Sequence, residues 1–249
     1  MKNVNNSLAL ANRKNIVQMS KKLILPGLVT LGLLMNANAV NAGMMDEPVV
    51  SKFTMDKLEV SDTEGNPKQW ELDFWVMQGL QRLVIKSEGE SVDGDTDSEN
   101  MLMYGQGIAP YWDIQVGLAH DTRGDESHSW AAVGLAGMAP YFFETEVYAL
   151  VDSDGTLGLR ASTEYEALIT QKLVLVPEIT ASAYSDDIPE IGIGAGLSAV
   201  NLSLRLKYEI KREFAPYIGI NWHKKLGNTA DMSSEEEETS LVAGISFWF

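Results

Sequence analysis

The sequence predicts an all-β protein: a transmembrane up-and-down antiparallel β-barrel of about 12 strands, preceded by an N-terminal signal peptide. Three observations predict it: apolar/polar alternation beyond residue 52, connections that alternate between short and long, and an aromatic last strand that ends on Phe249. Alternating side chains point to opposite faces of a strand. Outer-membrane barrels have short turns at one end and longer loops at the other.

The strands are predicted from the period-2 alternation. "ELDFWV" (71–76) and "LSLRLKYE" (202–209) each place charged residues on one face and apolar residues on the other. Such segments predict strands at 53–60, 69–78, 80–88, 100–109, 111–120, 128–138, 141–151, 156–167, 170–183, 196–209, 214–223 and 239–249. A soluble β-sandwich would also alternate, but the even strand count, the one-sided loops and the final "SLVAGISFWF" favour the barrel.

The connections are expected to differ between the two ends of the barrel. Short joints fall near Gly79, Pro110, Pro140, Leu168 and Lys211, whereas "GESVDGDTDSEN" and "DTRGDES" are among the longer acidic ones, and only 152–155 is tight on that side. The tripeptide Ala-Pro-Tyr occurs at 109–111, 139–141 and 215–217. Because proline cannot donate a ladder hydrogen bond, we expect all three at strand ends, with their aromatics in an interfacial girdle.

The N-terminal residues predict export. Met19-Ser20-Lys21-Lys22, an apolar run over 23–35 and "ANAVNA" have the pattern of a secretory signal peptide over residues 1–42, with a possible true start at Met19. Residues 43–52 are expected to be a short flexible segment and 53–249 the outer-membrane barrel. Removing 1–42 takes the net charge from −16 to −21, which excludes a nucleic-acid partner, and no cysteine is present.

The inward face of the predicted barrel is charged. By alternation it carries Glu71, Asp73, Arg82, Lys86, Asp113, Glu144, Glu146, Arg160, Glu164, Glu166, Lys172, Glu178, Arg205, Lys207 and Glu209. In a barrel of this size, mixed charges predict a packed, cross-linked interior, with a narrow cation path as the alternative. The histidines at 120, 128 and 223 are expected near the loop-side strand ends in solvent and show no triad spacing, so we predict no enzyme.

Several motifs together resemble the copper resistance protein B family. They are "YGQGIAPYWDIQVGLAHD", "SWAAVGLAGMAPYFFETEVYAL", "TEYEALITQKLVLVPEI" and "YEIKREFAPYIGINWHKKLG", and the resemblance runs from about Lys57 to Phe249. It implies a bacterial outer-membrane protein for copper tolerance that binds or sequesters copper. Many members carry a long Met- and His-rich N-terminal stretch, taken to be the copper-binding part. Here that stretch is reduced to Met44 and Met45, with Met55 nearby.

The resulting expectation is a non-enzymatic copper-binding and copper-tolerance protein that contributes to copper ion homeostasis. The expected metal contacts are Met44, Met45 and Met55, whose thioethers suit copper(I), and the expected partners are copper ions, outer-membrane lipid and the barrel-assembly machinery. We expect weak, separate copper contacts at the two ends of the barrel. The alternative is a structural or small-solute outer-membrane barrel without metal handling.

Overall fold

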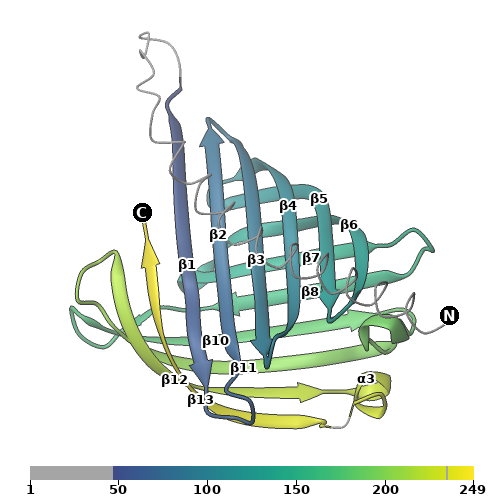
Figure 1. The fold of residues 1–249 in the computed structure, drawn as a ribbon. Coiled ribbons are helices and arrows are strands. Elements are labelled where there is room, and N and C mark those ends of the chain that lie inside the picture. The colour runs from purple at the N-terminus through teal and green to yellow at the C-terminus, as the bar shows by residue number, and fades with distance from the viewer. Residues whose placement is uncertain (1–46, 234) are drawn as a thin grey trace, which may run out of the picture. The chain divides into compact units, whose positions relative to one another are not determined.

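Residues 47–233 and 235–249 are described by a computed structural model (Figure 1). The predicted signal peptide and the methionines at 44 and 45 lie outside the described residues. The elements, in chain order, are β1 (Val49–Ser61), β2 (Lys68–Gln78), β3 (Gln81–Val92), β4 (Asp95–Ala109), β5 (Trp112–Arg123), β6 (Glu126–Ala139), η2 (Pro140–Phe142), β7 (Phe143–Val151), β8 (Leu157–Glu164), β9 (Ala167–Leu168), β10 (Leu173–Tyr184), η3 (Pro189–Ile191), β11 (Gly196–Tyr208), β12 (Phe214–Lys225), α3 (Gly227–Asp231) and β13 (Glu237–Trp248).

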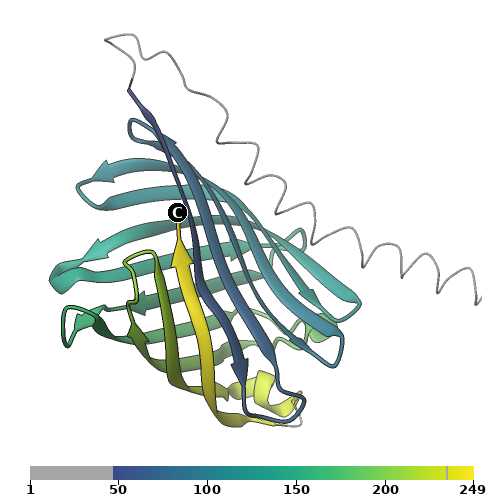
Figure 2. The ribbon, with the colours of Figure 1, turned by 60° about the vertical axis from the view of Figure 1, so that its left-hand side comes forward.

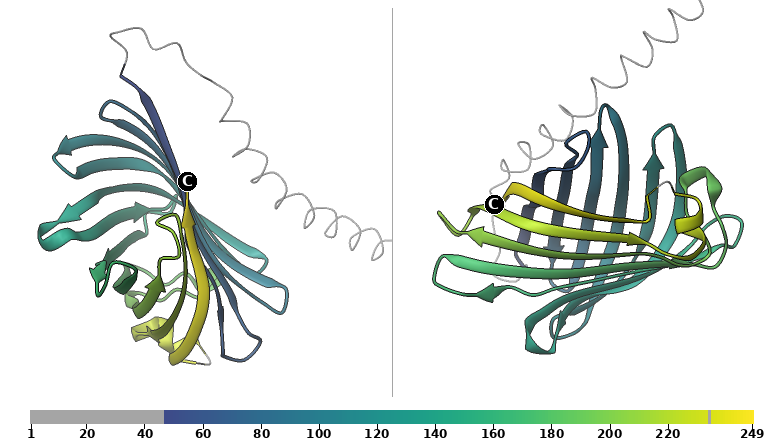
Figure 3. Two further views of the ribbon diagram at one scale, coloured as in Figure 1. Left: turned by 90° about the vertical axis from the view of Figure 1, so that its left-hand side faces the viewer. Right: turned by 90° about the horizontal axis from the view of Figure 1, so that it is seen from below.

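The strands form one antiparallel sheet that closes on itself. Each strand pairs with its neighbours in the chain, β10 pairs with β11, and the circle is completed where β1 pairs with β13. Figures 2 and 3 show this seam, with the last strand lying beside the first. β8 and the two-residue β9 both pair with β10 and together occupy one strand position in the barrel. Counted in this way, the barrel has the predicted twelve strands.

A proline explains why β8 and β9 are separate. Pairing with β10 stops at Glu164 opposite Glu178 and resumes at Ala167 opposite Leu175. The gap lies opposite Pro177, which has no N–H to donate across the ladder. The predicted strand 156–167 is therefore interrupted.

The two ends of the barrel are less different than the sequence predicts. We call the end with the β2–β3, β4–β5 and β6–β7 connections the turn side, and the opposite end the loop side. On the loop side, β3 and β4 extend to Val92 and Asp95, and β5 and β6 extend to Arg123 and Glu126. The prediction of long loops between β3 and β4 and between β5 and β6 is therefore wrong. Each connection is a two-residue turn, at 93–94 and 124–125. β1 also begins four residues earlier than expected, at Val49.

The Ala-Pro-Tyr prediction is correct for two copies and wrong for the third. Tyr111 and Tyr141 lie in turn-side connections with positive φ angles of 68° and 67°. Ala215-Pro216-Tyr217 instead lies inside β12. Pro216 is tolerated because pairing of β12 with β11 begins one residue later, so the missing N–H falls where β11 offers no partner.

The outward face of the barrel is apolar. Among its exposed side chains are Leu102, Val116, Leu118, Ile218 and Leu241. Tyr111, Tyr141 and Phe142 are exposed at the turn side, as expected for a girdle of aromatic residues. Within the described ranges, no helix has the length and apolar character needed to cross a membrane.

Candidate functional site: the barrel lumen

One side of the lumen is lined by ion pairs, and we call it the ionic side. Glu59 of β1 is fully buried, and its carboxylate accepts hydrogen bonds from Arg205 Nε (3.0 Å) and Nη2 (2.8 Å) and from the Tyr217 hydroxyl (2.8 Å). Arg205 also donates to Glu178 at 3.0 Å. A buried charge needs such a partner, because water no longer solvates it.

A β-bulge in β1 brings a further cation into this side. The register of β1 shifts between Met55 and Leu58, which interrupts the simple alternation. Lys57 Nζ then lies 2.6 Å from Glu71 of the neighbouring strand β2 and 2.8 Å from Glu178 of β10. In the sheet, β10 is separated from β1 by β11, β12 and β13. Strict alternation missed Lys57 and Glu59.

Further ion pairs cross the lumen between opposite walls. Lys86 of β3 lies 3.3 Å from Asp73 and 2.6 Å from Glu146 of β7. Arg160 of β8 binds Asp121 of β5 through both Nη atoms and Glu99 of β4 at 2.8 Å. The expectation of a cross-linked interior is therefore correct.

Three charged residues placed in the lumen by alternation lie elsewhere. Glu166 falls in the break between β8 and β9, and Lys172 precedes β10. Glu209 follows β11 and pairs with Arg212 in the same connection. The strands do not include these positions, so alternation does not apply to them.

The other side of the lumen is apolar, and we call it the apolar side. Its buried cluster is formed by inward side chains of β3 to β7 and of β10, with Ile188, Ile191 and Ile193 from the β10–β11 connection. Trp130 and Met103 are its largest fully buried side chains. Trp130 also donates from Nε1 to Asp121 (2.8 Å), so the indole joins the apolar cluster to the Arg160 network.

Between the two sides lies an excess of carboxylates, which we call the acidic cluster: Asp56, Glu71, Glu88 and Glu164. Asp56, Glu88 and Glu164 each interact electrostatically with Glu71. Within the described residues, Glu71 is paired with Lys57, whereas the other three form no ion pair within 4.0 Å. Lys207 acts on Asp56 and Glu164 from a longer distance. Carboxyl groups therefore outnumber their ion-pair partners in this part of the lumen.

The histidines are not all solvated, which corrects that expectation. His120 is exposed and lies 2.9 Å from the Ser129 hydroxyl. His128 is half-buried, lies 3.0 Å from Asp152 and packs on Trp130; His223 is half-buried and lies 2.7 Å from Asn201. No group of three or more His, Cys, Asp or Glu residues in the described part of the chain is arranged to hold a metal ion.

Methionines occur inside the barrel where the sequence reading did not consider them. Met101 and Met103 of β4 belong to or pack against the apolar cluster, and Met77 Sδ lies 3.8 Å from Arg82 Nη2. Met55, one of the predicted metal contacts, is half-buried and pairs with Leu72 and Phe247. Among the described residues, Met55 is not brought together with any of the histidines.

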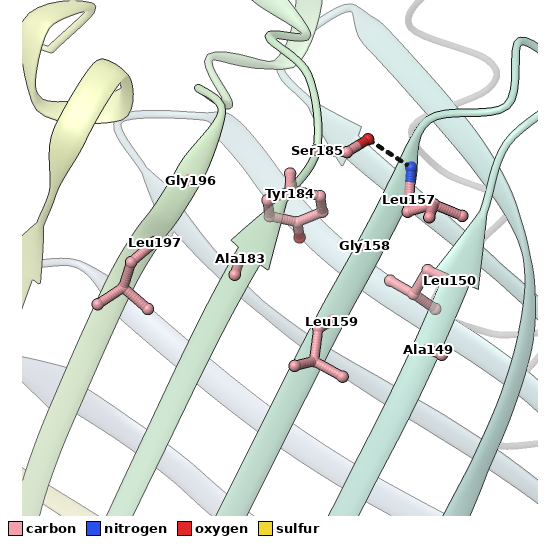
Figure 4. Close-up of a pocket in the computed structure, with 10 residues that line it drawn as sticks. All are labelled: Ala149, Leu150, Leu157, Gly158, Leu159, Ala183, Tyr184, Ser185, Gly196 and Leu197. Carbon is pink, nitrogen blue, oxygen red and sulfur yellow. Dashed lines mark hydrogen bonds between the residues drawn. The ribbon is translucent and has the colours of Figure 1, made fainter.

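A hollow of about 550 Å³ lies at the loop-side ends of β7, β8, β10 and β11 (Figure 4). Leu157, Leu159 and Leu197 form its apolar rim, and small residues such as Ala149 and Ala183 leave the space between them. These side chains alternate with the inward ones along their strands, so the hollow belongs to the apolar outer wall. It offers no polar chemistry and is not the functional site.

Comparison with known proteins identifies the family. Residues 49–249 match the family model described as copper resistance protein B precursor (CopB). The chain belongs to the copper resistance protein B family. It is 39% identical over 201 residues to copper resistance protein B of Escherichia coli, covering 78% of this chain and 68% of that protein. It is 35% identical to the homolog of Pseudomonas syringae pv. tomato, covering 82% and 71%.

Solved structures share the barrel fold with this family member. The NanC porin aligns with a TM-score of 0.51 and 13% identity, covering 80% of this chain and 99% of the porin. The KdgM porin aligns with a TM-score of 0.49 and 12% identity over similar shares. At this identity the likeness to the NanC porin concerns the fold alone, a closed antiparallel β-barrel.

Proposed function

We propose that this protein is a non-enzymatic copper-tolerance protein of the bacterial outer membrane that binds copper ions inside its barrel and so contributes to copper homeostasis. Membership of a family named for copper resistance supports the metal. The observation that carries the proposal is the acidic cluster, whose carboxylates outnumber their cationic partners in the middle of the lumen. A cation that enters there meets several carboxyl oxygens in a poorly solvated interior, where its electrostatic attraction to them is strong.

The proposed copper contacts are separate and individually weak. Met44, Met45 and Met55 offer thioethers, which suit copper(I), and the acidic cluster offers oxygen ligands, which suit harder ions. His128 and His223 add imidazole near the loop side, but each already has a polar partner. This distribution favours transient binding over one tight site.

The proposed orientation places the turn side in the periplasm. Outer-membrane barrels have this arrangement, and the signal peptide proposed for residues 1–42 exports the chain across the inner membrane. Phe249, which stacks on Phe53 at 4.9 Å between ring centroids, is the proposed recognition end for the barrel-assembly machinery. In intact cells, a cysteine at Asp125 should react with an impermeant thiol reagent, and one at Ala109 should not; the reverse labelling would contradict the orientation.

Copper binding tests the proposal directly. In the variant Asp56→Asn/Glu88→Gln/Glu164→Gln, purified protein should bind less copper in competition with a chelator, because three carboxyl groups without an ion-pair partner are gone. The matched control Asp93→Asn/Glu126→Gln/Glu190→Gln removes equal charge from loop-side connections and strand ends and should bind as the wild type does.

Tolerance in cells separates the two functions that the sequence leaves open. A deletion strain should grow less well in copper, and the lumen variant should restore growth less well than the matched control. Unchanged copper tolerance in the deletion strain, together with unchanged binding in the lumen variant, would instead favour a structural or small-solute barrel without metal handling.

A further inference from the structure

The β10–β11 connection, residues 185–195, folds into the mouth of the barrel instead of extending from it. Its sequence, "SDDIPEIGIGA", looks like an ordinary polar loop, yet Ile188, Ile191 and Ile193 are each less than 8% exposed. They belong to the same buried cluster as Trp130 of β6 and Leu150 of β7, strands that are not direct neighbours of β10 or β11. Apolar side chains in a loop are buried in this way when the loop covers something.

The connection has its own internal structure, so it can move as a unit. Ile188 and Ile193 exchange two backbone hydrogen bonds, of 2.7 and 3.1 Å, around the short helix η3. At its two ends, Ser185 is bonded to Leu157 of β8, and Gly196 has a φ of +95° that few other residues adopt. Figure 4 shows the Ser185–Leu157 bond beside Tyr184, where the connection leaves the wall.

Hydrogen bonds, which we call the latch, join this connection to the β12–β13 connection, which contains α3. Asp187 Oδ1 accepts hydrogen bonds from the Ala195 N–H (2.7 Å) and from the Asn228 side chain of α3 (3.0 Å). Thr229 Oγ1 accepts from the Gly194 N–H at 2.8 Å and lies 2.8 Å from the Ser198 hydroxyl. In Figures 1 and 3, α3 and this connection lie at the same end of the barrel.

Contact at the latch is close as well as polar. A Cβ atom added at Gly194 would come within 2.3 Å of the Thr229 backbone nitrogen. Only glycine therefore allows the two connections to meet here. A loop without a defined position over the barrel entrance would not require this close backbone contact.

We propose that residues 185–195 form a lid that closes the loop-side entrance of the lumen over the apolar side, and that α3 latches it shut through Asn228 and Thr229. The lid swings about Ser185 and Gly196. When the hydrogen bonds of the latch break, its three isoleucines leave the buried cluster of the apolar side. In the closed state solutes are kept from the inward face of β6, where Ala132 lies buried. This proposal goes beyond the copper function, since it concerns access for any solute.

Thiol labelling in purified full-length protein tests the lid. The chain has no cysteine, so Ala132→Cys is a single reporter beneath the lid, for a small charged methanethiosulfonate reagent. In the closed protein it should react slowly. Adding Thr229→Val, which has nearly the same shape but leaves the Gly194 N–H without its acceptor, should raise the labelling rate about tenfold.

Two controls separate opening from unfolding. Thr63→Val, an equivalent change in the β1–β2 connection, should leave the reporter slow, and a cysteine at Asp125 should react quickly in every background. Heat-modifiable migration on gels should show that each variant remains a folded barrel.

A second variant keeps the test decisive if Thr229→Val fails to fold. Replacing residues 186–194 with two glycines removes the lid while leaving the β10–β11 hairpin, and it should expose the reporter fully. If the reporter reacts equally fast with and without the lid, the lid proposal is wrong. Because the reagent carries no copper, this outcome is independent of whether the protein binds the metal.

Discussion

The two sides of the lumen fill the same barrel by different means. On the ionic side, Arg205 is buried only because Glu59 and Glu178 surround it. On the apolar side, Met103 and Trp130 are buried by shape, and a folded-in connection completes the packing. A barrel interior of this width can therefore be filled either by paired charges or by apolar contacts. Loss of one charged partner costs much folding stability at once, whereas loss of apolar atoms costs stability in proportion to the cavity that is left.

The largest expected effect comes from breaking the ionic side. Arg205→Met should destabilise the barrel by about 3–5 kcal/mol, because Glu59 is left buried and charged without its cation. Urea unfolding in detergent measures this loss. The triple variant Arg205→Met/Glu59→Leu/Tyr217→Phe removes Glu59 with both of its hydrogen-bond donors, while Glu178 keeps Lys57, and it should recover most of the stability. A triple variant as unstable as the single one would show that the side is not held by charge pairing.

A smaller effect is expected on the apolar side. Met103→Ala leaves a cavity in the buried cluster that contains Trp130 and should cost about 2–4 kcal/mol in the same unfolding experiment. The matched control is Leu102→Ala, the next residue of β4, which faces outward and is half exposed. It should cost less than about 1 kcal/mol. Equal losses at both positions would mean that Met103 contributes nothing through lumen packing.

The smallest expected effect is a loss of latch stability at acidic pH. The Ala195 N–H and the Asn228 amide hold the pKa of Asp187 below its usual value of 3.8. A lowered pKa stabilises the folded state above the unfolded-state pKa, and this contribution is lost as the pH falls through the folded value. Hydrogen-exchange protection of the lid should therefore stay constant from pH 7 to about 5 and fall only below 3.8.

Asp187→Asn provides the comparison for this pH effect. It should weaken the latch at neutral pH and remove the acid-dependent step. Asp186 and Glu190, the other carboxylates of the lid, remain in this variant, so any residual dependence on pH belongs to them. An unchanged acid step would assign the effect to those two residues and not to the latch.

The fold was predictable where one face of a strand meets an apolar environment. There the alternation is enforced by burial, and all twelve strands were found. It fails where both faces meet water, because polar residues then occupy every position: the loop-side ends of β3 to β6 read as loops for this reason. The lumen network was predictable only in part, since the bulge in β1 shifts the alternation at Lys57 and nothing local signals it.

The lid could not be predicted from its own residues. Ile188, Ile191 and Ile193 show neither strand nor helix periodicity, and their burial depends on Trp130 and Leu150, which are distant in the chain. For the same reason the predicted copper contacts stay a prediction: Met44 and Met45 precede the described residues, and ligands gathered from several strands leave no spacing pattern.

The seam between the first and last strands fixes the order of events when the protein is made. Phe53 and Phe249 exchange backbone hydrogen bonds of 2.9 and 3.0 Å, although they stand at opposite ends of the barrel sequence. Contacts between such distant residues form last and slowly, because a long loop must be closed first. The circle cannot close until β13 has been synthesised, because β13 pairs with β1. Until then the sheet has two open edges, and each can pair with whatever strand reaches it first.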